Sequence, residues 1–479
     1  MDILSPGDQT PCHMRPKKER YREMDGRCNH PLDFGSAMKP VKRYIKPQYQ
    51  DPEGYDTPRM FSVRGTNQPL PSPRAISRRL HTDRNLMDRH TMWLMQLGQF
   101  IDHDITSAPV PTEHNASIKC CGVPPDQVPK ECFPISVPTD DPVFPPCMEF
   151  VRSEPWRDTE GKIKYPREQM NALTAFVDGS AIYGSDKEMM ARLRVGGGKG
   201  ALLKTVVVNG KERLPHDTQA NSDMCLASHS TVSFCQLSGD GRVNEQPGLG
   251  SAHLLFHLFH NYIVKALTKG ILGKHRRPNS ELDVELYLHG EPDALQETIF
   301  QESRKIVGAV LQKITYCDWL PLILGPRLIR KYSLGCHGRS SYNHFVDPRI
   351  ANAFLTAAFR FGHSLIPNQL SINQEKRDLK DQFMVPDNVL LHFETIMEGM
   401  QSAGSQQKFD RHVVDAVTDH LFESTKGPKG ALDLIALNIQ RGRDHGIPPY
   451  YAWRKYYGLS RLEKNGIEFR RTMRDALRL

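Results

Sequence analysis

The chain has 479 residues, 38% of them hydrophobic, and a mean hydropathy of −0.52, as expected for a globular protein. Its 63 basic and 55 acidic residues leave a net charge of +8, spread in short patches such as Arg15–Arg20. This charge predicts mild attraction to anionic surfaces, and no nucleic-acid-binding motif accompanies it. No stretch approaches the roughly 18 to 20 continuous apolar residues that a membrane-spanning helix needs.

The cysteines indicate an oxidising compartment. Six of the ten lie in two local groups, which predict small disulfide-closed loops: Cys120, Cys121, Cys132 and Cys147, then Cys225 and Cys235. A zinc site is the weaker alternative, because no Cys-x-x-Cys pair is present. Asn115 begins an Asn-Ala-Ser glycosylation acceptor, in agreement with secretion. The start, Met1 to Lys17, lacks the features of an export signal, so we expect a secreted protein whose signal is missing from this sequence.

In chain order, residues 1–85 are rich in Pro and Arg and predict an extended, wrapping arm, with 1–24 as an N-terminal extension. Apolar residues at helical spacing predict a helix within 83–103, and proline-rich loop follows to 169. A short structured segment at 170–195 precedes a glycine turn at 196–200 and a short strand at 202–208. Further helices are expected at 249–272, 292–314, 347–363, 387–402, 408–423 and 429–442. The fold class is therefore mainly α, with long disulfide-tied loops and few short strands.

The first chemical motif is Gly98-Gln-Phe-Ile-Asp-His-Asp104. Successive helical residues are offset by about 100°, so Asp102 and Asp104 point to different sides of His103. Gln99 lies one turn earlier and shares the face of His103. Taken alone, such a cluster at a helix end is more often a solvated or capping group.

The second motif, Thr174 to Ser180, offers oxygen ligands at alternate positions. The side chains of Thr174, Asp178 and Ser180, with the carbonyl of Phe176, suit a hard cation such as calcium. The alternative is a turn in which these residues bond their own backbone. A single carboxylate makes a poor calcium site, so the interpretation requires Asp104 to complete it.

Two further motifs supply a guanidinium and a histidine. Arg242 and Glu245 could form a simple surface ion pair, but a guanidinium placed over a peroxide would stabilise the oxygen that leaves. His363 ends an apolar helix, where a histidine is usually a core or capping residue. Asn438, in a later apolar helix, could bond its second ring nitrogen, as ligating histidines require.

Together these motifs resemble the animal haem peroxidases of the peroxidase–cyclooxygenase superfamily. The segments GQFIDHD, TAFVDGSAIYG, SGDGRVNEQPG, AFRFGH and LNIQRGRDHG occur in the family's order and approximate spacing. The resemblance covers roughly residues 25 to 459 and is greatest to secreted invertebrate peroxinectin-like and chorion-peroxidase-like members. It implies a mainly helical haem peroxidase domain over 25–479 that reduces hydrogen peroxide and oxidises phenolic, tyrosyl or halide donors.

The resemblance also implies a role for each motif residue. His103 is the distal acid and base, Arg242 stabilises the transition state, and Gln99 lines the pocket where halide or water sits. Haem b is held by two ester bonds and Ca²⁺ binds nearby. The haem residues are Asp102 and Glu245 (esters), His363 (axial iron ligand), Asn438 (its partner), and Arg360 and Arg441 (propionates). The calcium residues are Asp104, Thr174, Phe176, Asp178 and Ser180.

Some features depart from the family's pattern. Gln246 stands where myeloperoxidase-like members carry a methionine that forms a third haem link, so no sulfonium bond is expected. A later helix carries histidines at i, i+4 and i+7 that resemble a metal-binding face, but we expect them to be structural: His253, His257 and His260. The family's domain continues beyond residue 479, so truncation at the C-terminal end is expected. Cys317 and Cys336 either pair with each other or have lost a partner.

Two alternatives to an active peroxidase remain open from the sequence. One is a protein for cell adhesion or matrix binding, since peroxinectin-like relatives combine both roles, although no Arg-Gly-Asp sequence is present. The other is an inactive, truncated pseudo-peroxidase. The physiological donor is not indicated.

Overall fold

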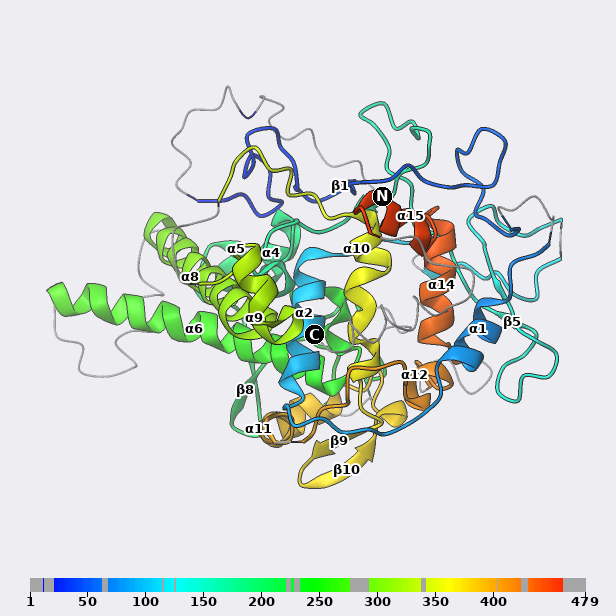
Figure 1. Ribbon diagram of the computed structural model, residues 1–479. Helices are drawn as coiled ribbons and strands as arrows, with labels where there is room; N and C mark the ends of the chain where they lie inside the picture. Colours follow the sequence, from blue (N-terminus) through cyan, green and yellow to red (C-terminus); the bar gives the residue numbers. More distant parts are fainter. Residues whose placement is uncertain are drawn as a thin grey trace.

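The computed structural model describes residues 12, 21–62, 68–113, 116–124, 126–220, 225–227, 233–275, 293–336, 342–402, 404–423 and 430–459. Helices dominate, and the strands pair only as two-stranded antiparallel ladders (Figure 1). The predicted mainly helical fold class is confirmed. Several expectations fall outside the described residues: the glycosylation acceptor Asn115, the basic patch Arg15–Arg20, most of 1–24, and 460–479.

Two long helices form one side of the core, α6 (Pro247–His275) and α8 (Asp293–Lys313). Their apolar faces pack together through fully buried side chains such as Leu249 and Phe300. Helix α2 (Trp93–Ile105) lies against α6, with Phe100 in the same cluster. The helices predicted at 249–272 and 292–314 are therefore confirmed, because long apolar periodicity is the most reliable helix pattern.

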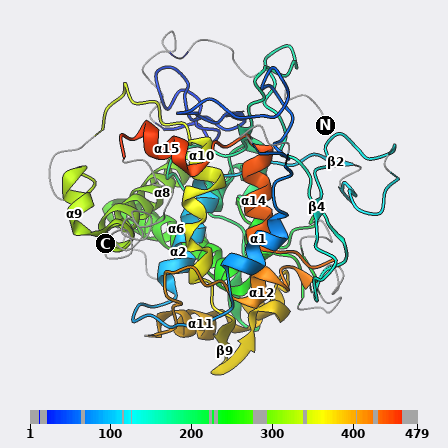
Figure 2. The same ribbon diagram turned by 45° about the vertical axis from the view of Figure 1, so that its right-hand side comes forward.

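A second group of helices stands beside α2, with α14 (Leu434–Asp444) next to α10 (Asn352–Thr356) in both views (Figures 1 and 2). Helix α10 ends at Ala357, whose φ of −138° and ψ of −61° are not helical, and the 3₁₀ helix η5 (Ala358–Leu365) follows. The single helix expected at 347–363 is thus wrong. The break turns η5, which carries His363, toward α2.

Three other sequence predictions are corrected. The helix within 83–103 begins only at Trp93, because the preceding residues form backbone hydrogen bonds with the segment around Gln407. That same pairing, with the bridge between Leu421 and Leu432, reduces the helix expected at 408–423 to α12 (Asp415–Thr418). The arm at 1–85 contains an unexpected helix, α1 (Pro73–Leu80), capped by Ser72.

The remaining elements are short, apart from α9 and from α11, which confirms the helix expected at 387–402. The strand expected at 202–208 covers only β7, and the glycine turn contains positive φ angles. These elements are β1 (Lys39–Pro40), β2 (Thr112–Glu113), β3 (Ala116–Ser117), β4 (Ile135–Ser136), β5 (Cys147–Met148), β6 (Met170–Asn171), α3 (Ser180–Tyr183), α4 (Lys187–Leu193), α5 (Val195–Gly198), β7 (Val206–Val208), β8 (Lys211–Arg213), η3 (Gly241–Asn244), η4 (Ile314–Trp319), α9 (Leu320–Lys331), β9 (Gln369–Ile372), β10 (Glu375–Asp378), η6 (Leu379–Asp381), α11 (Asp387–Gln401) and α15 (Tyr450–Tyr456).

Disulfides tie the long loops, as the cysteine spacing predicted. The bonds join Cys12 to Cys28, Cys120 to Cys132, Cys121 to Cys147 and Cys225 to Cys235. Cys317 and Cys336 are free thiols, with their side chains in hydrogen-bond contact.

One helical run differs from the expectation of no membrane span. Residues Asp293–Lys331 are long and apolar enough to cross a membrane by length and composition alone, a test that core helices of soluble proteins also pass. Ile299, Phe300 and Val307 of this run are buried against α6. Only 28% of the apolar stretch is buried, and a single helix of this kind is weak evidence for a membrane span.

Candidate active site

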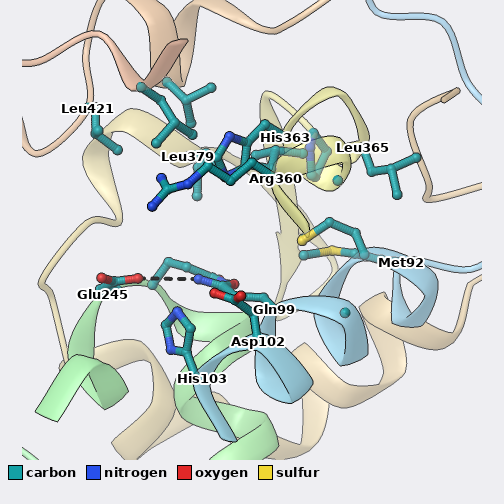
Figure 3. Close-up of a pocket in the computed structure, with 18 of the residues that line it drawn as sticks. Met92, Gln99, Asp102, His103, Glu245, Arg360, His363, Leu365, Leu379 and Leu421 are labelled. Carbon is teal, nitrogen blue, oxygen red and sulfur yellow. Dashed lines mark hydrogen bonds between the residues drawn. The ribbon is translucent and has the colours of Figure 1, made fainter. Parts of the chain in front are cut away.

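A cavity of about 310 Å³ lies between η5 on one side and α2 with η3 on the other. Figure 3 shows polar side chains facing each other across it, His363 and Arg360 above and Gln99, Asp102, His103 and Glu245 below. Much of the remaining wall is apolar, formed by residues that include Phe359, Phe361, Leu379, Leu421, Leu434 and Leu437. The structure thus brings motifs far apart in the sequence to opposite walls of one cavity.

Helix α2 supplies His103 and Gln99 to the lower wall from one face, as the i, i+4 spacing predicted. Gly98 lies beside the ring of Trp319, where an added Cβ would be 3.0 Å from the indole, so a larger residue would push the helix away. Burial, and then the charge of Arg242, hold the pKa of His103 well below its ordinary value. His103 is therefore neutral and able to accept a proton.

Arg242 is fixed by a residue that sequence reasoning did not single out, Asp240. Its carboxylate accepts hydrogen bonds from Nε of Arg242 at 2.8 Å and from Nη2 at 2.6 Å. Burial would lower the pKa of Arg242, but Asp240 raises it above its usual value. Arg242 also donates to the carbonyl of Thr106, at the end of α2, at 3.1 Å. The guanidinium is therefore permanently charged and tied to the helix that carries His103.

Asp240 also faces His103. The Nδ1 atom of His103 is buried without a hydrogen-bond partner and lies 3.8 Å from Asp240 Oδ1, which leaves Nε2 for the cavity. Burial would raise the pKa of Asp240, but Arg242 and His103 lower it, so the carboxylate stays charged. The detectable sequence pattern was an aspartate two residues before an arginine at the start of a short helix, where it serves as N-cap.

Two further carboxyl groups line the cavity, Asp102 and Glu245. Burial raises the pKa of both, that of Glu245 to about 7. Asp102 accepts a hydrogen bond from Thr106 at 2.8 Å, and Glu245 accepts one from Gln99 at 3.2 Å. Both groups are therefore held in place at the cavity edge, where each could attach a bound group.

On the opposite wall, Asn438 of α14 lies between His363 and Arg360. Its amide nitrogen is 2.7 Å from His363 Nδ1, and its amide oxygen accepts from Arg360 at 2.6 Å. Burial, and then Arg360, lower the pKa of His363 to about 3, so its ring is neutral. Burial also lowers the pKa of Arg360 to about 10, and this guanidinium has no ion pair among the described residues. An anionic group in the cavity would satisfy it.

Arg441 is not brought to the cavity with the others. Its guanidinium donates to Asp444 at 3.1 Å and to Ser153 at 3.0 Å, and it lies over the ring of Phe150. These contacts connect α14 to the disulfide-tied loops.

The residues of the second motif gather around Asp104 below His103. Its carboxylate accepts from the backbone N–H groups of Asp178, Gly179 and Ala181 at 3.0 to 3.2 Å. Thr174 donates to Asp178 at 2.8 Å. Burial, and then Asp178, raise the pKa of Asp104 to about 7.

Two buried carboxylates with hydroxyl and carbonyl oxygens beside them form a suitable donor set for calcium, because this cation binds several oxygen ligands at once. The hydroxyls come from Thr174 and Ser180, and the carbonyl of Phe176 accepts from Thr174 at 3.5 Å. A bound cation would also offset the repulsion between the two carboxylates.

The three histidines of α6 are engaged separately rather than around one point. His253 contacts the hydroxyl of Ser238 at 2.9 Å, and His257 contacts a backbone carbonyl at 2.8 Å. His260 lies between the hydroxyl of Tyr183 and another carbonyl. Burial lowers the pKa of all three, as for neutral core residues.

The structure is thus a mainly helical domain in which one cavity has a histidine on each wall. The family described as animal haem peroxidase matches residues 21–476, and the chain belongs to that family. Myeloperoxidase of Mus musculus is 35% identical over 93% of this chain, and thyroid peroxidase of Rattus norvegicus is 32% identical over 93%. The chain spans only 61% and 49% of these two relatives.

Solved structures agree on the fold. Peroxidase A from Dictyostelium discoideum has a TM-score of 0.69 at 24% identity, covering 94% of this chain and 80% of that one. A fatty acid alpha-dioxygenase from Arabidopsis thaliana has a TM-score of 0.62 at 19% identity, covering 95% and 68%. At these identities the likeness shows the fold alone.

Proposed function

We propose that this chain is a secreted haem peroxidase that reduces hydrogen peroxide and oxidises small phenolic, tyrosyl or halide donors. The observation that carries the proposal is the pair of opposed groups in one cavity: His363 with Asn438 on one wall, and His103 with Arg242 on the other. Haem supplies the redox chemistry in this family, and the residues of the chain supply position, protons and charge.

His363 would be the axial ligand, which requires a ring nitrogen without hydrogen toward the iron. In the structure the Asn438 amide turns its nitrogen to His363 and its oxygen to Arg360. Rotating this amide by half a turn makes its oxygen accept from His363 Nδ1, which leaves Nε2 free to bind iron. The rotation also frees Arg360 for a propionate, whose negative charge this buried guanidinium would accept. Arg441 would be a second partner for a propionate, once its guanidinium moved away from Asp444.

On the other wall, neutral His103 would accept at its Nε2 a proton from one peroxide oxygen. It would then return this proton to the other peroxide oxygen, which leaves. Arg242 holds its positive charge where negative charge develops on the leaving oxygen. Because Asp240 and Thr106 already fix this guanidinium, little reorganisation is needed at the moment of bond cleavage. Gln99 lines the place where the donor anion or a water sits.

The carboxyl groups of Asp102 and Glu245 would form the two ester bonds to haem methyl groups. Ca²⁺ at Asp104, Thr174, Phe176, Asp178 and Ser180 would fix the end of α2. The position of Asp104 directly after His103 supports this role.

Secretion is proposed from the four disulfides, which persist in oxidising compartments. An adhesion role has no residue in the described structure that favours it.

The test is to express the chain with a signal peptide, add haem and calcium, and record the Soret band and peroxide-dependent oxidation of a phenol. His103→Ala should retain haem but lose peroxide cleavage by about 10²–10⁴-fold, the usual contribution of general acid–base catalysis. His363→Ala should lose the Soret band. Failure of the wild-type chain to retain haem would refute the proposal, and haem retention without turnover would favour a pseudo-enzyme.

A further inference from the structure

Two buried glutamines lie at the corner of the cavity formed by Gln99 and Glu245: Gln246, which also lines the cavity, and Gln96, which does not. The amide nitrogen of Gln246 donates to Gln96 at 2.7 Å and to Gln99 at 3.0 Å. The nitrogen of Gln96 also donates to Gln99, at 3.2 Å. The oxygen of Gln99 therefore accepts two hydrogen bonds from these two glutamines.

The backbone at the start of α6 sets the direction of this chain of amides. The N–H of Gly248 donates to the oxygen of Gln246 at 2.7 Å. Because a backbone N–H is only a donor, Gln246 must turn its oxygen to Gly248 and its nitrogen to Gln99. Gln99 must then turn its oxygen back to Gln246.

Gly248 is required for this close approach. A Cβ added there would lie 2.5 Å from the oxygen of Gln96 and 3.0 Å from the oxygen of Gln246. Any larger residue would separate Gln246 from the backbone N–H that orients it. The glycine thus explains why the network can begin at the backbone.

The consequence appears at the cavity. With its oxygen held by Gln96 and Gln246, Gln99 turns its N–H groups the other way, and one donates to Glu245 at 3.2 Å. Among the described residues no second acceptor is recorded for this amide, so the other N–H is available to a ligand. An ester at Glu245 would remove the negative charge beside it and strengthen the attraction for an anion.

We propose that Gln246 is a positioning residue that locks the amide of Gln99 with its N–H groups toward the cavity, where they can donate to a small anion. The inference rests on the proposed function, since it concerns the donor site of that cavity. It assigns a role to the residue that stands where the resemblance implies a methionine in myeloperoxidase-like members.

Two substitutions separate orientation from size. Gln246→Glu keeps the shape but has only acceptor oxygens, so it can no longer donate to Gln99 and favours the reversed orientation, in which Gln99 turns its N–H groups toward it. Gln246→Met removes the link without reversing it, because Gln96 still donates to Gln99. Gln440→Met, at a buried glutamine on α14 that donates to the carbonyl of Phe133, is the matched control.

The probe is bromide. Its dissociation constant is measured from the Soret shift of the haem-loaded protein, and its position from anomalous scattering in crystals with and without haem. Losing one hydrogen bond of about 1 kcal/mol predicts about fivefold weaker binding for the methionine variant. Reversing the amide predicts at least about thirtyfold weaker binding for the glutamate variant, and the Gln440 variant should be unchanged.

The proposal is overturned if the glutamate variant binds bromide with wild-type affinity. It is also overturned if the methionine variant binds bromide as weakly as the glutamate variant, or more weakly. In either case the size of the side chain, not the orientation of the amide, would determine the affinity. If the glutamate variant does not fold, wild-type affinity in the methionine variant overturns the proposal and the fivefold loss supports it. If the wild-type protein retains no haem, the proposed function fails. A bromide peak beside Gln99 in haem-free crystals, lost in the Gln246 variants, would still support the positioning role, and no peak would overturn it.

Discussion

Replacing Asp240 by asparagine tests whether Arg242 acts because it is held in place. Asp240 accepts from Nε and Nη2 of Arg242 and, as N-cap of η3, from its backbone N–H at 2.8 Å. Asparagine keeps the shape and one acceptor, but its NH₂ group meets a guanidinium N–H, and the negative charge beside His103 is lost. Arg242 should therefore shift from the position that faces the leaving oxygen.

The expected magnitude follows from the contact that is lost. A hydrogen bond to a charged group contributes about 1.5–3 kcal/mol, and each 1.4 kcal/mol corresponds to about tenfold in rate. If that energy is lost in the transition state, the reaction with peroxide slows by about ten- to 150-fold. Stopped-flow absorbance in the Soret region gives this second-order rate constant, with haem content and melting temperature measured for each variant.

The matched control is Asp217→Asn, which breaks an ion pair with Arg192 whose side chains are 19% and 25% exposed. Its effect on the peroxide reaction should be negligible, because the pair lies away from the cavity lining. An Asp240→Asn protein with full haem and a wild-type rate constant would refute the reasoning. Arg242 would then not need its carboxylate partner.

The remaining predictions concern attachment, metal and stability. Asp102→Ala should make haem partly extractable by acidic organic solvent, because one of two ester carboxylates is lost; complete retention would argue against that bond. Chelation of calcium should lower the melting temperature, because Asp104 and Asp178 are then left buried side by side; an unchanged melting curve would contradict the calcium site. Arg74→Met should lower the free energy of unfolding by about 3–5 kcal/mol in denaturant titrations, because Asp433 loses its buried partner at 2.8 Å. A change below about 1 kcal/mol would show that this buried pair contributes little.

The long helices could be predicted from the sequence because their apolar periodicity extends over many turns. Short elements could not, because tertiary contacts decide them. Helix α1 depends on Arg74, which is buried among aspartates distant in the sequence. The segment after residue 83 has helical spacing, yet Met87 is 52% exposed and bridges to Gln407. Periodicity without burial does not form a helix there.

The candidate site was predictable at the level of motifs, since each motif carries its own chemistry. The contacts between motifs were not. Gln246 and Gln96 are 150 residues apart, so no local pattern indicates that they share a hydrogen bond. For Arg441 the motif predicted a residue at the cavity, but in the structure its guanidinium pairs with Asp444.

One such contact joins two motifs that the sequence presents separately. Gly239 lies so close to the end of the segment Thr174–Ser180 that an added Cβ would be 2.4 Å from the carbonyl oxygen of Ser180. The next residue, Asp240, donates its N–H to the carbonyl of Ala181, the residue that follows this segment, at 3.1 Å and holds Arg242 with its side chain. The segment that would bind calcium therefore positions Arg242 as well as the helix end that carries His103. Loss of calcium should accordingly slow peroxide cleavage through both groups, even where haem remains bound.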